Sequence, residues 1–248
     1  MARPGPGAAR GRRPLEHGAG AAHLGMSLRA RASWAGQAGA TGGLGMAKIL
    51  VIGATGLIGS AVASALAARN EVIKAARTPA DGVEAVDISK PDSIASLFAR
   101  IGTVDGIICA AGSAPMVPWS DVTTQVLMAG LGGKFADQAN VIIGGYPHVT
   151  PGGSITVTTG VLAEHPMPGS AVTTTANSAL AGLVRAAALE LQGSVRVNAV
   201  SPGWVSETLA KLGRDPSEGM PAALVADVYV EALDVDVSGH VLDAVKKP

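Results

Sequence analysis

Short runs of apolar residues alternate with longer helical segments along the chain after Met46. The apolar runs, each typical of a buried strand, span residues 48–52, 71–75, 83–86, 106–110, 154–158, 195–200 and 240–244. The segments between them are typical of helices and span residues 57–69, 91–101, 121–143, 171–191 and 221–233. We expect the third helix to break at residues 130–133, where three of the four residues are glycine. This alternation predicts right-handed crossovers and a doubly wound α/β fold, with about seven parallel strands covered by helices on both faces.

The composition suits one domain with a large core. The chain has 248 residues, of which 48% are hydrophobic and only 3% aromatic, so aliphatic residues must form most of the core. The 19 basic and 19 acidic residues balance, which argues against nucleic acid or a membrane surface as a partner and favours a small molecule. No apolar run reaches the roughly 20 residues that span a bilayer, and the single Cys109 fits a reducing compartment. We therefore expect a soluble, cytoplasmic protein.

Residues 1–45 differ from the rest of the chain. They contain mainly Gly, Ala, Arg and Pro, with six arginines and Glu16 as the one acidic residue. Such a segment cannot bury enough apolar surface to offset the entropy lost on ordering, so we predict a disordered N-terminal extension. A transit peptide is an alternative, as is a translation start at Met26 or Met46. The folded domain is then predicted to span residues 46–248.

A glycine-rich turn joins the first predicted strand to the first predicted helix. In the sequence ILVIGATGLIGSAVASALA, Gly53 permits a tight turn, Gly56 lets the backbone approach a pyrophosphate, and Gly59 lets helix and strand pack closely. The helix N-terminus adds amide donors and partial positive charge. The alternative is a glycine-rich turn without a ligand. We predict a Rossmann fold whose cofactor contacts here are Gly53, Thr55, Gly56, Leu57, Ile58 and Gly59.

The end of the second predicted strand indicates which dinucleotide is bound. An acidic residue at this point reads the free 2′-hydroxyl of NAD, whereas a nearby arginine accommodates the 2′-phosphate of NADP. The sequence here is VIKAARTP, with Arg77 and Thr78 and no acidic residue. A guanidinium can bind phosphate with two charge-assisted hydrogen bonds, so we expect NADP(H) to be favoured over NAD(H). The alternative is that Arg77 is an ordinary solvated surface residue.

Several further segments resemble the short-chain dehydrogenase/reductase family, and the similarity extends from Met46 to about Val245. AVDIS with Asp87 resembles the adenine-side element of the family, and CAAG at 109–112 matches the second half of its Asn-Asn-Ala-Gly turn. VRVNAVSPGWV at 195–205 and SGHVLDA at 238–244 are similar to its last two strands. The resemblance implies an adenosine side formed by Asp87, Ala111 and Gly112, and a nicotinamide side formed by Pro202, Gly203 and Val205.

The resemblance fails at the catalytic positions. Family members use a Tyr that exchanges a proton, a Lys four residues later that lowers the pKa of the phenol and holds the ribose, a Ser and an Asn. Alignment of the helix at 171–191 places Thr173 at the Tyr and Asn177 at the Lys. Thr159, or Thr158, matches the Ser, and Gly130 falls near the Asn. A threonine hydroxyl has no usable acidity near neutral pH, and a neutral amide cannot lower the pKa of a neighbour.

Another proton donor is available after the strand at 154–158. Glu164 and His165 lie in the following loop, at the carboxyl edge where doubly wound folds bind ligands. His is the commonest general acid, so we hypothesise that this pair contributes to any residual chemistry. The alternative is an exposed loop pair without a catalytic role. No residue spacing suggests a metal site.

Two functions fit these observations. The first is an NADP(H)-dependent oxidoreductase that acts on an unknown small carbonyl or alcohol substrate through a non-standard active site. The second is a catalytically silent dinucleotide-binding module that senses redox state or acts in an assembly. By resemblance alone, we expect a homo-dimer or homo-tetramer that associates through the helices at 121–143 and 171–191.

Overall fold

The structure is a computed structural model that describes residues 46–78 and 80–245. The predicted N-terminal extension at 1–45 lies outside the described residues, and so does the alternative of a transit peptide. In the described part of the chain, no helix is long and apolar enough to cross a membrane.

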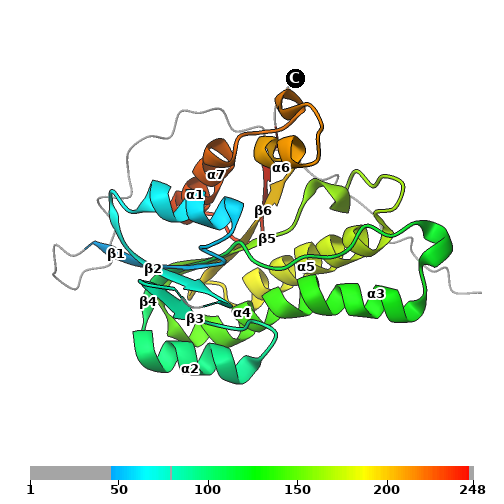
Figure 1. The fold of residues 1–248 in the computed structure, drawn as a ribbon. Helices are drawn as coiled ribbons and strands as arrows, with labels where there is room; N and C mark the ends of the chain where they lie inside the picture. The colour runs from blue at the N-terminus through cyan, green and yellow to red at the C-terminus, as the bar shows by residue number, and fades with distance from the viewer. Residues whose placement is uncertain (1–45, 79, 246–248) are drawn as a thin grey trace, which may run out of the picture. The chain divides into compact units, whose positions relative to one another are not determined.

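Seven parallel strands form one sheet in the order β3-β2-β1-β4-β5-β6-β7 (Figure 1). The strands are β1 (Ala47–Ile52), β2 (Asn70–Ala76), β3 (Val83–Ala85), β4 (Val104–Cys109), β5 (Val149–Thr158), β6 (Arg196–Pro202) and β7 (Val241–Ala244). The order reverses between β1 and β4, and doubly wound folds bind dinucleotides in the crevice at such a point. The predicted doubly wound Rossmann fold is therefore confirmed.

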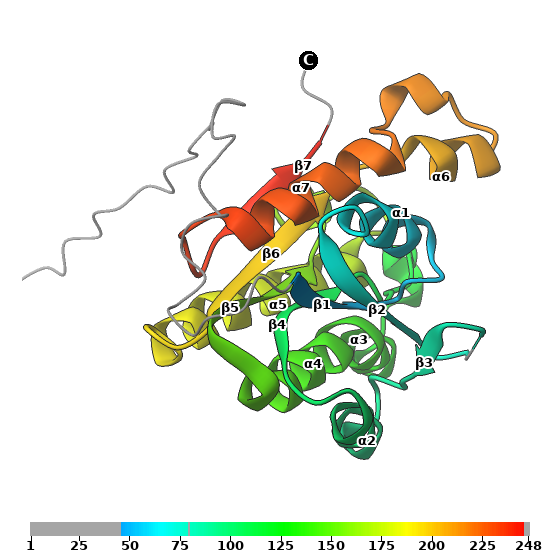
Figure 2. The ribbon, with the colours of Figure 1, turned by 90° about the vertical axis from the view of Figure 1, so that its left-hand side faces the viewer.

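Helices cover both faces of the sheet (Figure 2). One face carries α1 (Leu57–Leu66) and α7 (Ala222–Asp234), whose apolar side chains pack together on β1 and β6. The other face carries α2 (Pro91–Ile101), α4 (Asp137–Gly145) and α5 (Ala171–Glu190). The remaining helices are α3 (Thr124–Leu131), which packs beside α5, and α6 (Ser206–Lys211), which follows β6.

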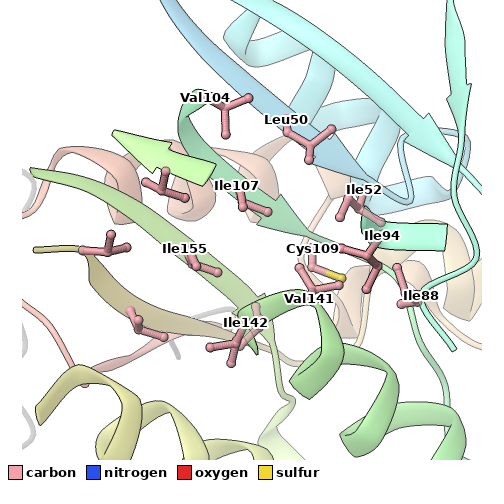
Figure 3. Close-up of a cluster of buried hydrophobic side chains, with 14 of the residues drawn as sticks. Leu50, Ile52, Ile88, Ile94, Val104, Ile107, Cys109, Val141, Ile142 and Ile155 are labelled. Atoms are coloured by element: carbon pink, nitrogen blue, oxygen red, sulfur yellow. The ribbon is translucent and has the colours of Figure 1, made fainter. Parts of the chain in front are cut away.

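The core below the centre of the sheet is almost entirely aliphatic. Ile107 and Cys109 of β4 and Ile155 of β5 point toward Val141 and Ile142 of α4 (Figure 3). These strands are buried on both faces, which explains why they are continuous apolar runs rather than alternating ones. This packing fixes the distance between α4 and the sheet. It therefore also fixes the position of the helical turn that precedes α4.

The structure corrects the expected break at residues 130–133. The chain stays helical from α3 to α4, and residues Gly132–Ala136 form one π-helical turn between them. Glycine weakens a helix but does not end it when tertiary packing compensates. Gly130 is buried against α5, where an added β-carbon would lie 2.0 Å from Cγ1 of Val172. Gly130 therefore permits close packing against α5, and the glycine-rich segment does not break the helix.

Candidate active site

The turn after β1 has the geometry that a phosphate site needs. Gly53 has a φ of 84° and donates its amide to the Ala75 carbonyl oxygen at 2.8 Å. A β-carbon on Gly53 would lie 2.9 Å from the carbonyl oxygen of Ala110, which follows β4. Only glycine combines this positive φ with such a close approach between neighbouring strands.

The third glycine of the motif brings α1 against this turn. A β-carbon on Gly59 would lie 2.1 Å from the carbonyl oxygen of Gly53, so the helix can begin here only because the side chain is missing. Thr55 and Gly56 are exposed, and Leu57 and Ile58 are half-buried. The first turn of α1 therefore presents backbone to solvent at the carboxyl edge of the sheet, where helix amides and the helix dipole favour an anion.

The loop after β4 borders the same edge. Ala111 is half-buried and Gly112 is exposed, with a φ of 103° that favours glycine. The next amide, of Ser113, donates to the Gly133 carbonyl oxygen at 3.1 Å and ties this loop to the π-helical turn. This hydrogen bond holds the loop after β4 against the π-helical turn.

Several charged residues lie at the predicted adenosine side, after β2 and β3. Arg77 and Thr78 are exposed immediately after β2, as the sequence predicted. Burial and the negative charge of Asp87 raise the pKa of Asp137, whereas Arg77 lowers it, so these three charges act on one another. Hydrogen bonds from Ser89, followed by the contact with Lys90, lower the pKa of Asp87.

The predicted nicotinamide side follows β6. The amide of Gly203 donates to the Ala244 carbonyl oxygen at 3.0 Å, and Pro202 is half-buried beside it. Val205 is buried and precedes the first turn of α6. Residues 202–205 therefore have a defined backbone position at the carboxyl edge of the sheet.

The threonine hydroxyls proposed for catalysis are hydrogen-bonded to backbone carbonyl groups. Thr159 Oγ1 donates to Val200 O at 3.2 Å. Thr158 Oγ1 donates to Cys109 O at 2.7 Å and also contacts the Tyr229 hydroxyl at 2.6 Å. Both threonines are buried, and the Tyr229 pKa is raised because its phenol is buried. These bonds direct both hydroxyl protons into the protein interior.

Thr173 and Asn177 lie one turn apart on α5, at different depths. Thr173 Oγ1 donates toward Ala114 O at 3.2 Å and Pro115 O at 3.1 Å, which holds the loop after β4 against the helix. The Asn177 side chain is buried and its Nδ2 lies 3.5 Å from Gly160 O. Asn177 Oδ1 has no hydrogen-bond partner, which is uncommon for a buried polar atom.

Glu164 and His165 lie in the loop after β5, and both are exposed. Thr159 and Asn177 are buried, so the structure does not bring the loop pair to the same depth as those two residues. Their place at the carboxyl edge agrees with the expectation from sequence.

The sequence reasoning missed two buried polar residues on the helix that it expected to break. Lys134 belongs to the π-helical turn, is only 8% exposed, and donates from Nζ to Thr159 O at 3.1 Å. Burial lowers the pKa of its ammonium to about 8, and the nearby Cys109 partly opposes that shift. Gln138 exchanges two hydrogen bonds with the Thr158 backbone, at 2.8 and 2.7 Å. Lys134 and Gln138, which are four residues apart and therefore lie on one helical face, were the available signal.

A pocket of about 250 Å³ opens beside the N-terminus of α5. Its walls come from the loops after β4 and β5 and from the first turn of α5, and they are mainly apolar. The lining residues are Val117, Trp119, Pro166, Met167, Pro168, Gly169, Ser170, Ala171 and Thr174. Within residues 46–78 and 80–245, no group of three or more His, Cys, Asp and Glu side chains could hold a metal ion.

Comparisons with known proteins agree with this geometry. A family model described as Enoyl-(Acyl carrier protein) reductase matches residues 43–231. The structure of the protein lin1944 from Listeria innocua is 34% identical, with a TM-score of 0.74 over 80% of this chain and 99% of that chain. A small-chain dehydrogenase in complex with NADPH is 26% identical, with a TM-score of 0.70 over 80% and 96% of the two chains. A short-chain dehydrogenase family protein from Francisella tularensis, at 20% identity and a TM-score of 0.66, covers 80% of this chain and 97% of its own and shares the fold. A search of the curated proteins gives no match.

Proposed function

Because the chain belongs to the short-chain dehydrogenase/reductase family, we propose that it is an NADP(H)-dependent oxidoreductase with a non-standard active site. Its substrate is a small carbonyl compound, or the corresponding alcohol in the reverse direction. The close packing of Gly59 on Gly53 carries the proposal. It lets the first turn of α1 present its backbone amides to an anion at the point where the strand order reverses.

The residues beyond β2 support NADP(H) over NAD(H). Arg77 is exposed and makes none of the ion pairs within the described residues, so its guanidinium is available to a 2′-phosphate. The comparison structure of a small-chain dehydrogenase in complex with NADPH agrees with this preference. In our proposal Thr78 and Asp87 adjoin the adenosine half, and Pro202, Gly203 and Val205 adjoin the nicotinamide half.

The active site is non-standard because Thr173 and Asn177 replace the Tyr and Lys that the family resemblance implies. Thr159 keeps a hydroxyl at the Ser position, where it donates to Val200 O, and the remaining acid–base candidates are the exposed pair Glu164 and His165. His165 directly precedes Pro166, which lines the apolar pocket, and in our proposal its imidazole donates the proton to a substrate carbonyl bound there. The apolar walls favour a substrate with a hydrocarbon or aromatic body.

Titration of NADPH and NADH against the protein tests this proposal. We expect tighter binding of NADPH, and Arg77→Ala should weaken NADPH binding at least tenfold while leaving NADH binding unchanged. Arg69→Ala is the matched control, because Arg69 is an exposed arginine before the opposite end of β2. A panel of aldehydes, ketones and quinones then separates an enzyme, which oxidises NADPH, from a silent dinucleotide-binding module, which does not. Equal affinities for the two coenzymes would contradict the NADP(H) preference.

A further inference from the structure

Lys134 is a buried cation whose hydrogen-bonding capacity is larger than its known contacts use. An ammonium group has three N–H donors, and the contact with Thr159 O uses one of them. None of the ion pairs within the described residues involves Lys134. A buried charge without a carboxylate partner is unfavourable unless other polar groups contact it. A purely structural role does not explain why the core retains a lysine here.

Asn177 has the opposite property, because its side chain holds a hydrogen-bond acceptor without a donor. Its side chain is 2% exposed, and its Oδ1 is a buried acceptor without a hydrogen-bond partner. A β-carbon on Gly160 would lie 3.0 Å from Asn177 Nδ2, so Gly160 provides the room for this amide. The helix α5 therefore carries an unused acceptor, and the π-helical turn carries unused donors.

These two side chains meet the same short stretch of backbone. Lys134 Nζ contacts the carbonyl oxygen of Thr159, and Asn177 Nδ2 lies near that of Gly160, the next residue. Their helices lie side by side on one face of the sheet (Figure 1). A hydroxyl group both donates and accepts, so it can satisfy the Lys134 donors and the Asn177 acceptor together.

We propose that Lys134 and Asn177 form one subsite that binds the ribose hydroxyls on the nicotinamide side of the cofactor. The amine comes from the π-helical turn and the amide from α5, which reverses the arrangement that the family resemblance implies. The two groups have exchanged helices, so the site keeps a cation at this position although residue 177 is neutral. This inference rests on the proposed function, because it presupposes that the crevice holds a nicotinamide dinucleotide.

The local backbone supports this assignment. Lys134 lies in the π-helical turn Gly132–Ala136, which interrupts the α-helical geometry between α3 and α4. Such turns are frequent at functional sites. The carbonyl oxygen of Gly133, in the same turn, accepts the Ser113 amide at 3.1 Å. The turn that carries Lys134 is thereby connected to the loop after β4, which lines the predicted dinucleotide crevice.

Substitution of Lys134 tests the binding role. We expect Lys134→Met, which keeps an apolar chain of similar length, to weaken NADPH binding at least tenfold without lowering the melting temperature. Lys134→Gln, which keeps a hydrogen-bond donor, should show a smaller loss. Lys48→Met is the matched control, because Lys48 Nζ also donates to a backbone carbonyl, Ile101 O at 2.6 Å, but at the amino edge of the sheet. NADPH affinity within twofold of wild type in Lys134→Met would overturn the inference.

The exchange of helices predicts a rescue. Asn177→Lys places a second buried cation beside Lys134 and should weaken NADPH binding. The double variant Lys134→Asn with Asn177→Lys restores one amine and one amide, so we expect its affinity to return to within about threefold of wild type. If the loss of binding free energy in the double variant equals the sum of the losses in Lys134→Asn and Asn177→Lys, the two residues act independently. That result would overturn the inference.

Proton uptake during NADPH binding distinguishes a ligand-binding lysine from a structural one. Hydroxyl contacts favour the charged form of the Lys134 amine. NADPH binding to wild type at pH 8 should therefore be accompanied by the uptake of at most about half a proton per site. Calorimetry in buffers of different ionisation enthalpy measures this uptake. Cys109 of β4 faces Lys134, but burial raises its thiol pKa to about 11, and burial followed by the charge of Asp87 raises the pKa of the Asp137 carboxyl. The uptake should persist in Lys48→Met and disappear in Lys134→Met. Wild type that binds neither coenzyme would overturn the proposed function as well, whereas binding with unchanged uptake in Lys134→Met would overturn this inference alone.

Discussion

Gly59 lies so close to Gly53 that a β-carbon on Gly59 would be 2.1 Å from the Gly53 carbonyl oxygen. The obstructing atom belongs to the backbone of the turn after β1, which is itself held by the hydrogen bond from the Gly53 amide to Ala75 O. The turn cannot move without loosening its contact with β2. The start of α1 is therefore determined by the absence of one side chain.

We expect Gly59→Ala to displace the first turn of α1. Overpacking of this kind costs about 1–3 kcal/mol of unfolding free energy, and the displaced amides can no longer approach a diphosphate. NADPH binding by calorimetry and urea denaturation measure the two effects. Gly182→Ala is the control, because a β-carbon there meets no atom within 4 Å and the residue lies in the interior of α5. The unfolding free energy of Gly182→Ala should rise by up to about 1 kcal/mol, and this variant should bind NADPH normally. Equal stability and equal NADPH affinity in Gly59→Ala and Gly182→Ala would contradict the packing argument.

Lys134 should lower the stability of the protein at neutral pH. Burial lowers its pKa from 10.5 to about 8, which corresponds to about 3 kcal/mol of unfavourable charge burial below pH 8. Lys134→Met removes this cost but leaves Thr159 O without its donor, a loss of about 1 kcal/mol. We therefore expect the variant to be more stable by about 2 kcal/mol at pH 7, measured by chemical denaturation. A less stable variant would show that the ammonium is better solvated than its burial indicates.

The same pKa shift predicts how the difference changes with pH. Between about pH 8 and 10.5 the folded state has released the Lys134 proton while the unfolded state still holds it. The unfolded state then binds more protons, so the unfolding free energy of wild type rises with pH in this window. The stability gap between Lys134→Met and wild type should shrink toward zero by about pH 10. A gap that stays constant from pH 7 to pH 10 would contradict this linkage.

His165 should supply the proton in carbonyl reduction. We expect His165→Ala to lower NADPH-dependent turnover by about 100-fold with an unchanged NADPH affinity, since general acids contribute factors of this size or more. His240→Ala is the control, because His240 is exposed just before β7, at the amino edge of the sheet. Steady-state assays on a reactive aldehyde compare the two variants. Unchanged turnover in His165→Ala would remove this residue from the reaction.

The helices on one face should mediate self-association. Ile143 of α4 is 62% exposed and Met128 of α3 is 60% exposed, and burial of such side chains in an interface is favourable. We expect size-exclusion chromatography at micromolar concentration to show two or four times the chain mass of 24.6 kDa. Ile143→Glu should shift the profile toward monomer. A wild-type profile that contains only monomer would refute the expectation.

The alternation of apolar runs and helical segments predicted the sheet because the central strands are buried along most of their length and therefore form continuous apolar runs. Gly53, Gly56 and Gly59 determine a turn within seven residues, so their spacing alone was informative. The glycines at 130–133 misled the prediction, because the helix continues through them and Gly130 admits Val172 of the distant helix α5. A packing requirement of that kind cannot be read from neighbouring residues.

The sequence by itself determined the doubly wound fold and the glycine-rich turn, because these features depend on residue type and short-range spacing. Only the tertiary structure decided which polar groups lie near one another. Lys134 and Asn177 are 43 positions apart in the sequence and approach consecutive carbonyl groups, of Thr159 and Gly160, only because α4 and α5 pack on the same face of the sheet. The same packing removes Lys134 from water, and this desolvation lowers the pKa of its ammonium group to about 8.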